Sequence, residues 1–226
     1  MLISGFDKVT LLNYPGLVAC TIFTKGCNLK CPFCHNSSLI SGNDDTYIDE
    51  DEIFKYLNKR KNIIEGVCIS GGEPLLQKDI KEFIKKIKSL GLKVKLDTNG
   101  TNPDLILSLI NDNLLDYIAM DIKNIKSKYE LTSGAKVKID NILKSINIIE
   151  NSGIDYEFRT TIIKEFHTLS DIDYISKKLD KKSKYYIQNF VKSDAVLDKN
   201  LHSFTNDELK EMKQILNNEN IIFRDL

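Results

Sequence analysis

The chain has 226 residues, 42% of them hydrophobic, which is enough to bury the core of one domain without disulfide bonds. Its 32 lysines and arginines balance 32 aspartates and glutamates, so no excess charge indicates binding to nucleic acid or to a membrane surface. No secretion signal is recognisable, and no apolar run approaches the roughly 20 residues that span a bilayer. The totals predict one cytoplasmic domain over residues 1–226, with no nucleic-acid or membrane partner.

Six apolar, strand-like runs alternate along the chain with stretches that have helical periodicity. The strands are predicted at residues 17–24, 66–70, 92–98, 116–122, 156–163 and 184–190. The helices are predicted at residues 49–61, 78–91, 103–112, 138–151, 170–179 and 205–216. In the second helix, Ile80, Phe83, Ile84 and Ile87 share one face, the lysines point outward, and Gly91 is the expected C-cap.

This alternation predicts an α/β fold of parallel strands joined by right-handed crossovers, with helices covering the sheet. Six such units fit a partial, open (β/α)6 TIM-like barrel better than a closed eight-fold one. Polar motifs follow the first four predicted strands: "TKGCNLKCPFCHN", "SGGEP", "DTNG" and "DIK". Because functional residues gather where parallel strands end, we expect these four loops to form one site.

Three of the five cysteines are clustered as Cys27-x3-Cys31-x2-Cys34. In a reducing compartment, such clustering favours metal or redox chemistry over a disulfide framework, and thiolates suit zinc and iron-sulfur clusters. Zinc would need a fourth ligand, and His35 is awkwardly placed for this because it is adjacent to Cys34. A 4Fe-4S cluster with one open iron would explain why the loop supplies three ligands.

The remaining motifs each allow a ligand-binding and a purely structural interpretation. In "SGGEP", the glycines let the backbone approach a ligand and Glu73 can accept a hydrogen bond from an ammonium group, but the same residues could form an ordinary turn. Asp97 and Asp121 could offer oxygens to a hard cation, or could simply belong to a turn and a strand end. Arg159 lies in an apolar strand and needs a partner there, either a cofactor or a salt bridge.

The cysteine motif, with Phe33 before the last cysteine, resembles the defining sequence of radical S-adenosylmethionine (SAM) enzymes. In that family, three cysteines hold a 4Fe-4S cluster whose open iron binds the amino and carboxylate groups of SAM. An electron from the reduced cluster cleaves SAM to methionine and a 5'-deoxyadenosyl radical, which abstracts hydrogen from the substrate. The resemblance implies a partial barrel of the radical SAM type, with Cys27, Cys31 and Cys34 as catalytic cluster ligands.

The resemblance also implies roles for the other motifs. "SGGEP" resembles the GGE motif that holds the methionine amino group, and "DTNG" and "DIK" resemble positions in pyruvate formate-lyase activating enzyme that contact SAM and a monovalent cation. The implied SAM-binding residues are Phe33, His35, Gly71, Gly72, Glu73, Thr98, Asn99, Lys123 and Arg159. Asp97 and Asp121 are the implied ligands of a possible monovalent cation, together with Thr98.

Residues 6–36 resemble the opening of the activating proteins of anaerobic ribonucleoside-triphosphate reductase. Such activases transfer the radical to a backbone glycine of a large partner enzyme, which implies a glycyl radical enzyme as partner and a flavodoxin or ferredoxin as electron donor. Residues 36–50 lack cysteine, so one cluster is expected. Val191 stands where pyruvate formate-lyase activating enzymes carry a histidine, which favours the reductase as partner.

Three alternatives remain open from the sequence. The first is a pyruvate formate-lyase-type activase, and the second is a radical enzyme acting on a small molecule or peptide, similar to 7-carboxy-7-deazaguanine synthase. The third is a zinc-stabilised or redox-sensing binding module without enzymatic activity. Outside the motifs, Cys20 and Cys68 are predicted to be buried thiols, and His167 and His202 are predicted to be surface residues.

Overall fold

The computed structural model describes residues 1–41, 47–216 and 218–224. Within them, one sheet contains eight strands in the same order along the chain and across the sheet. The strands are β1 (Ile3–Thr10), β2 (Ala19–Thr24), β3 (Gly66–Gly71), β4 (Lys93–Thr98), β5 (Tyr117–Asp121), β6 (Asp155–Ile162), β7 (Tyr185–Asn189) and β8 (Ile221–Phe223). β1 and β2 are antiparallel, and the other neighbouring strands are parallel.

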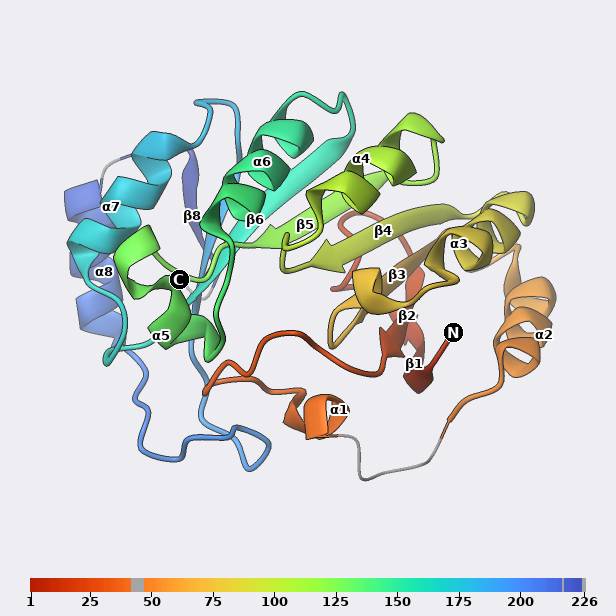
Figure 1. The fold of residues 1–226 in the computed structure, drawn as a ribbon, viewed down its shortest axis with the longest axis horizontal. Coiled ribbons are helices and arrows are strands. Elements are labelled where there is room, and N and C mark those ends of the chain that lie inside the picture. The colour runs from red at the N-terminus through yellow and green to blue at the C-terminus, as the bar shows by residue number, and fades with distance from the viewer. Residues whose placement is uncertain (42–46, 217, 225–226) are drawn as a thin grey trace.

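Helices cover the outer side of the curved sheet, as Figure 1 shows. The longer ones are α2 (Glu50–Arg60), α3 (Ile80–Ser89), α4 (Pro103–Asn111), α6 (Ile139–Glu150), α7 (Leu169–Lys178) and α8 (Asn206–Leu216). The described chain also contains the short helices α1 (Ser37–Ser41) and α5 (Tyr129–Ser133), and 3-10 turns at Pro74–Leu76 and Lys126–Lys128. The segment from β2 to α1 crosses the opposite, concave side of the sheet (Figure 1).

Local sequence signals explain where several helices begin and end. α7 begins with a capping box in which Thr168 and Asp171 each accept a hydrogen bond from the other's backbone N–H. α4 begins at Pro103, directly after Asn102, whose side chain caps the first turn. α3 is followed by Gly91 with a φ of +79°, as the sequence predicts for its C-terminus.

The two faces of the sheet differ in chemistry. Successive side chains of a strand point to opposite faces. In β4, Val94 and Leu96 are fully buried in the main apolar core with side chains of the covering helices, so Lys95 and Asp97 face the concave side. We call the helix-covered side the outer face and the concave side the inner face. The outer face is apolar, and the inner face carries buried charges.

The predicted fold class is confirmed. The six predicted strands correspond to β2–β7, and the described strands leave the sheet open because β1 and β8 are not paired with each other. The sequence interpretation misses β1, an edge strand with mostly half-buried or exposed side chains, and β8, which has only three residues. The prediction of buried thiols is confirmed, since Cys20 and Cys68 are both 0% exposed.

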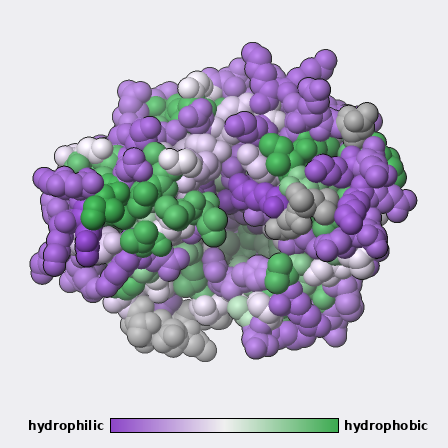
Figure 2. Space-filling model, turned by 180° about the vertical axis from the view of Figure 1, so that it is seen from behind, coloured by the Kyte–Doolittle hydropathy of each residue, from purple (hydrophilic) through white to green (hydrophobic). Residues whose placement is uncertain are grey.

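Seen from the side opposite to Figure 1, much of the molecular surface is hydrophilic (Figure 2). On the side opposite to Figure 1, patches of hydrophobic side chains lie between hydrophilic ones, on either side of a central hollow (Figure 2). Among the described helices, none is both long enough and apolar enough to cross a membrane.

Candidate active site

The predicted site residues meet at one cavity of about 260 Å³ on the inner face. Its walls come from the loop after β2, from the ends of β3, β4 and β5, and from β6. The predicted residues that line it are Cys27, Cys31, Phe33, Cys34, His35, Gly71, Gly72, Glu73, Asp97, Thr98, Asn99, Asp121, Lys123 and Arg159. Residues separated by more than half of the chain are thus brought to one place.

The three cysteines lie on residues 25–36, which we call the cysteine loop. Other loops hold its backbone: Lys30 N donates to Ser133 O (2.9 Å), and Asp198 N donates to Pro32 O (2.9 Å). The close approach to Ser133 depends on Gly134, where a Cβ would lie 2.2 Å from Lys30 O. The cysteine loop is therefore fixed by segments from the far half of the sequence.

The cysteine thiols occupy a partly buried, largely apolar environment. Burial raises the pKa of Cys27, Cys31 and Cys34, and the positive charge of Lys123 partly opposes this. In the described part of the chain, no three His, Cys, Asp or Glu side chains converge closely enough to hold one metal ion. A 4Fe-4S cluster does not need such convergence, because each cysteine binds a different iron.

The two glycines of "SGGEP" make the cysteine loop fit against β3. A Cβ on Gly72 would lie 1.9 Å from Gly26 O, and a Cβ on Gly71, which has a φ of +122°, would lie 2.2 Å from Thr24 N. Glu73 N donates to Gly26 O at 2.8 Å. Close backbone contact within the protein therefore requires these glycines, whether or not they also approach a ligand.

Glu73 is 1% exposed and is held from three sides. Its Oε1 accepts hydrogen bonds from Leu75 N (3.1 Å) and Thr98 Oγ1 (2.8 Å), and its Oε2 accepts one from Asn99 N (2.7 Å). Burial raises the pKa of Glu73 to about 7 despite these donors. A carboxylate has about four acceptor positions, so one position on Oε2 is left for a further donor.

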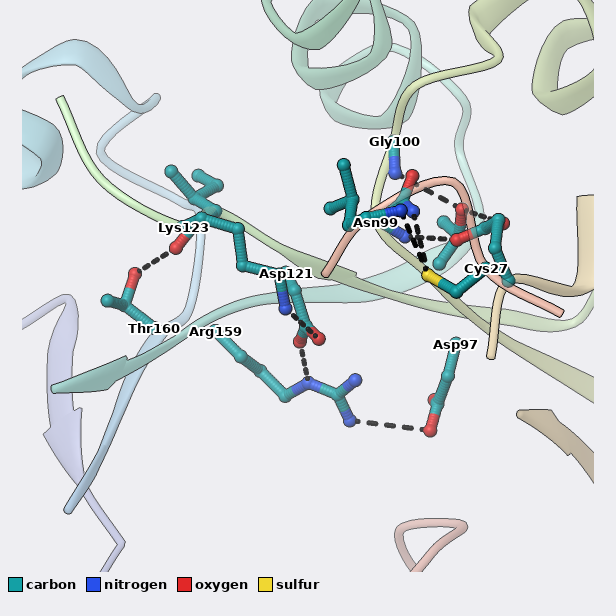
Figure 3. Close-up of polar contacts among 12 residues, drawn as sticks. Cys27, Asp97, Asn99, Gly100, Asp121, Lys123, Arg159 and Thr160 are labelled. Carbon is teal, nitrogen blue, oxygen red and sulfur yellow. Dashed lines mark hydrogen bonds and ion pairs between the residues drawn. The ribbon is translucent and has the colours of Figure 1, made fainter. Parts of the chain in front are cut away.

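Arg159 lies between two carboxylates on the inner face (Figure 3). Its Nε is 2.8 Å from Asp121 Oδ1, and its Nη1 is 3.5 Å from Asp97 Oδ2. Lys123 Nζ is 3.0 Å from Asp121 Oδ2. Burial alone would raise the pKa of Asp121, but the charges of Arg159 and Lys123 outweigh burial and hold this pKa well below its usual range.

The two carboxylates predicted to bind a cation are already paired. The fourth oxygen of the pair, Asp97 Oδ1, contacts Lys95 Nζ. All four oxygens of Asp97 and Asp121 thus face a positively charged nitrogen from Lys95, Lys123 or Arg159. A monovalent cation at these oxygens would have to displace at least one of these groups.

Sequence analysis missed three further members of this charged group. Lys95 and Glu157 are 2% and 1% exposed, and Arg224 Nη2 is 2.7 Å from Glu157 Oε1. The available signal was the alternation of charged and apolar residues in "KVKLD" and "EFR", which places the charges on one face of a strand.

The two histidines without a motif differ in burial. His202 is exposed, as predicted, but the prediction of a surface position is wrong for His167, which is 3% exposed. His167 Nδ1 accepts from Ile163 N (3.2 Å), so its Nε2 is the donor to Lys123 O (2.8 Å). Burial lowers the pKa of His167 and keeps this ring neutral. His167 therefore holds the backbone of the cavity-lining Lys123.

A sequence model described as the radical SAM superfamily matches residues 21–176. The chain belongs to the radical SAM superfamily. The matched region contains every predicted site residue, from the cysteine loop to β6. Membership in this superfamily of enzymes implies a 4Fe-4S cluster and SAM as cofactors, and the donor set of the cavity fits them: three thiols on one loop, and carboxylate, ammonium and guanidinium groups opposite.

Relatives of this radical SAM protein include activating enzymes. A Methanocaldococcus jannaschii protein named "Putative glycyl-radical enzyme activating enzyme" is 34% identical over 99% of the chain and 95% of its own length. The pyruvate formate-lyase-activating enzyme of Clostridium pasteurianum is 28% identical over 78% of the chain and 74% of its own length. Among solved structures, Streptococcus suis SuiB bound to its precursor peptide SuiA has a TM-score of 0.71 at 18% identity. The match covers 90% of this chain but only 48% of SuiB, and it shows that the fold is shared.

Proposed function

We propose that this protein is a glycyl radical enzyme activating enzyme, which removes a hydrogen atom from a backbone glycine of a large partner enzyme. The observation that carries this proposal is the similarity to the Methanocaldococcus jannaschii relative, which extends over 99% of the chain rather than over the cysteine motif alone. The cofactors supply a one-electron reductive cleavage of SAM that gives methionine and a radical able to take hydrogen from carbon.

In this proposal, the protein holds both cofactors at the inner-face cavity. Cys27, Cys31 and Cys34, which line the cavity, would hold three irons of the cluster and leave the fourth iron available to SAM. The remaining acceptor position of Glu73 receives the amino group of SAM, and Arg159 and Lys123 lie on the opposite side for its carboxylate. The other proposed contacts to SAM are Phe33, His35, Gly71, Gly72, Thr98 and Asn99.

We further propose anaerobic ribonucleoside-triphosphate reductase as the partner and a flavodoxin or ferredoxin as the electron donor. Val191, in place of a histidine typical of pyruvate formate-lyase activating enzymes, supports the reductase. A monovalent cation is not included, since every oxygen of Asp97 and Asp121 already has a cationic partner.

The experiment is an activation assay under anaerobic conditions. The reconstituted, reduced protein is mixed with SAM and either anaerobic ribonucleotide reductase or pyruvate formate-lyase, and radicals are recorded by electron paramagnetic resonance. We expect a glycyl doublet with the reductase and none with Cys31→Ser as activase. SAM cleavage without a glycyl radical on either partner would contradict the proposed function. A doublet on pyruvate formate-lyase alone would reassign the partner.

A further inference from the structure

Lys95 is a buried charge to which neither the sequence motifs nor the proposed chemistry assigns a role. It lies in the middle of β4, and the strand register places Cys68 of β3 and Tyr117 of β5 on its two sides. Lys95 Nζ is 3.9 Å from Cys68 Sγ and 5.8 Å from the centre of the Tyr117 ring, and it pairs with Asp97. The side chain is 2% exposed, so a long flexible cation is held in one place inside the sheet.

We propose that the ammonium group of Lys95 takes the place of a bound monovalent cation in this protein. Resemblance to related activases implies a cation at Asp97 and Asp121, but the groups that surround these two carboxylates in the structure do not fit one. The two carboxylates contact three positive groups, Lys95, Lys123 and Arg159. A third buried carboxylate, Glu157, lies 3.8 Å from Arg159 Nη1 and pairs with Arg224 at 2.7 Å, so the whole group has four positive and three negative charges. A further cation would therefore add positive charge to a buried group that is already more than neutralised.

Lys95 acts on the cavity through Asp97 rather than directly. Asp97 Oδ1 contacts Lys95, while Asp97 Oδ2 faces Arg159 Nη1 at 3.5 Å. Without the ammonium group, Asp97 would be a buried carboxylate that depends on Arg159 alone and would draw this guanidinium away from Asp121. Lys95 is in this sense a positioning residue for Arg159, which lines the cavity.

The role of an internal cation can be separated from ordinary packing by changing charge and space independently. Lys95→Ala removes the ammonium group and leaves room for an ion. Lys95→Met removes the charge but keeps most of the volume, so an ion cannot enter. Lys93→Ala, two positions earlier on the same strand and exposed, is the matched surface control.

The test measures equilibrium binding of SAM to the cluster-loaded protein in tetramethylammonium, sodium or potassium salts at one ionic strength. For the wild type and for Lys93→Ala, we expect the affinity for SAM to differ by no more than about twofold among the three salts. A tenfold difference, for comparison, corresponds to about 1.4 kcal/mol. Lys95→Ala should bind about tenfold more weakly in tetramethylammonium and regain affinity in sodium or potassium. Lys95→Met should be weakened without regaining affinity.

Three results would overturn the inference. The first is a wild-type affinity that rises about tenfold or more with sodium or potassium, which needs no variant to fold. The second is a Lys95→Ala protein that binds SAM as the wild type does, and the third is a weakened Lys95→Ala protein that no cation restores. The inference rests on the SAM site of the proposed function but not on its partner. If the SAM affinities of the variants follow these expectations but no glycyl radical forms on a partner enzyme, only the activase assignment is refuted.

Discussion

The outer and inner faces of the sheet are built by the same strands but follow different rules. In β6, Phe158 is fully buried in the apolar core beneath the helices, whereas the next residue, Arg159, forms ion pairs with three carboxylates. On the outer face, stability comes from removing apolar surface from water, and side chains of similar volume are interchangeable. On the inner face, each buried charge depends on specific partners, so a single loss leaves another charge unpaired.

This difference separates residues that maintain the fold from residues that maintain the cavity. Changes on the outer face should alter stability and leave cofactor binding intact. Changes on the inner face should alter cofactor binding or its pH dependence even where the protein remains folded.

The loop cysteines and the core cysteines provide the largest expected contrast. Cys27→Ala should lose essentially all cluster iron, because the loop then offers two thiolates instead of three. Cys20→Ala, on the outer face, should keep its iron and lose only about 1 kcal/mol of unfolding free energy. Burial raises the pKa of Cys20 to about 12, so this thiol stays protonated and unreactive. Iron analysis and circular dichroism measure both effects, and equal iron content in the two variants would remove the cluster assignment.

Phe158→Ala removes a buried ring from the apolar core on the outer face. The variant should lose about 3–5 kcal/mol of unfolding free energy, because a fully buried ring leaves a cavity in the core. At a temperature where the variant remains folded, its affinity for SAM should match that of the wild type. Chemical denaturation and equilibrium binding test the two statements, and a large loss of affinity in the folded variant would show that the faces are not independent.

Glu73 gives the inner face a pH dependence. Between pH 4.5 and about 7, the folded protein keeps a proton on Glu73 that the unfolded chain has released, so the free energy of unfolding falls as pH rises through this range. The fall should amount to about 2–4 kcal/mol, since the pKa rises from 4.5 to about 7 and each unit corresponds to about 1.4 kcal/mol. Denaturation at several pH values should show a flatter profile for Glu73→Gln than for the wild type. Glu82→Gln, on an exposed side chain, should keep the wild-type profile.

Substitutions of His167 test whether SAM binding depends on the hydrogen bond between this ring and the backbone of Lys123. His167→Phe leaves Lys123 O and Ile163 N without their partners, at about 1–3 kcal/mol for each group, and should weaken SAM binding. His167→Gln can still donate to Lys123 O and should restore most of the affinity. His202→Gln, on the exposed histidine, should change neither the free energy of unfolding nor the affinity for SAM. Equal affinities in the Phe and Gln variants would assign His167 to packing alone.

The smallest effect is expected at the start of α7, at Thr168, which does not line the cavity. Thr168→Ala removes the side-chain cap of this helix and should cost about 1 kcal/mol of unfolding free energy. Thr168→Ser keeps the hydroxyl group and should recover most of this loss. Thermal or chemical denaturation measures the change, and SAM affinity should not respond to either substitution.

The sequence predicts the outer face and the motif-bearing loops well because both signals are local. β2–β7 follow from apolar runs, and the site residues of the cysteine loop, "SGGEP", "DTNG" and "DIK" are each found within a few positions of one another. Their common cavity follows from the rule that parallel strands end on one side of a sheet.

The remaining features depend on contacts that the sequence does not display. Lys93 and Lys95 look alike in "LKVKLDT", yet one is exposed and the other is buried, because Lys93 is the first residue of β4 whereas Lys95 lies between Cys68 and Tyr117 of the neighbouring strands. Arg224 meets Glu157 across two strands from distant parts of the chain. His167 lies in a polar loop that resembles a surface segment. It is buried in the structure, where its two ring nitrogens form hydrogen bonds with Ile163 N and Lys123 O.

The contact between the cysteine loop and "SGGEP" has a consequence for how the protein matures. Gly26 O accepts its hydrogen bond from Glu73 N, and α2 lies between these residues in the chain. The three thiols can take their final arrangement only after β3 has docked beside β2. Ser133 and Asp198 must also close on the loop, so we expect iron and sulfide to bind to a largely folded chain, and a chain that stops folding earlier would expose three unligated thiols to oxidation.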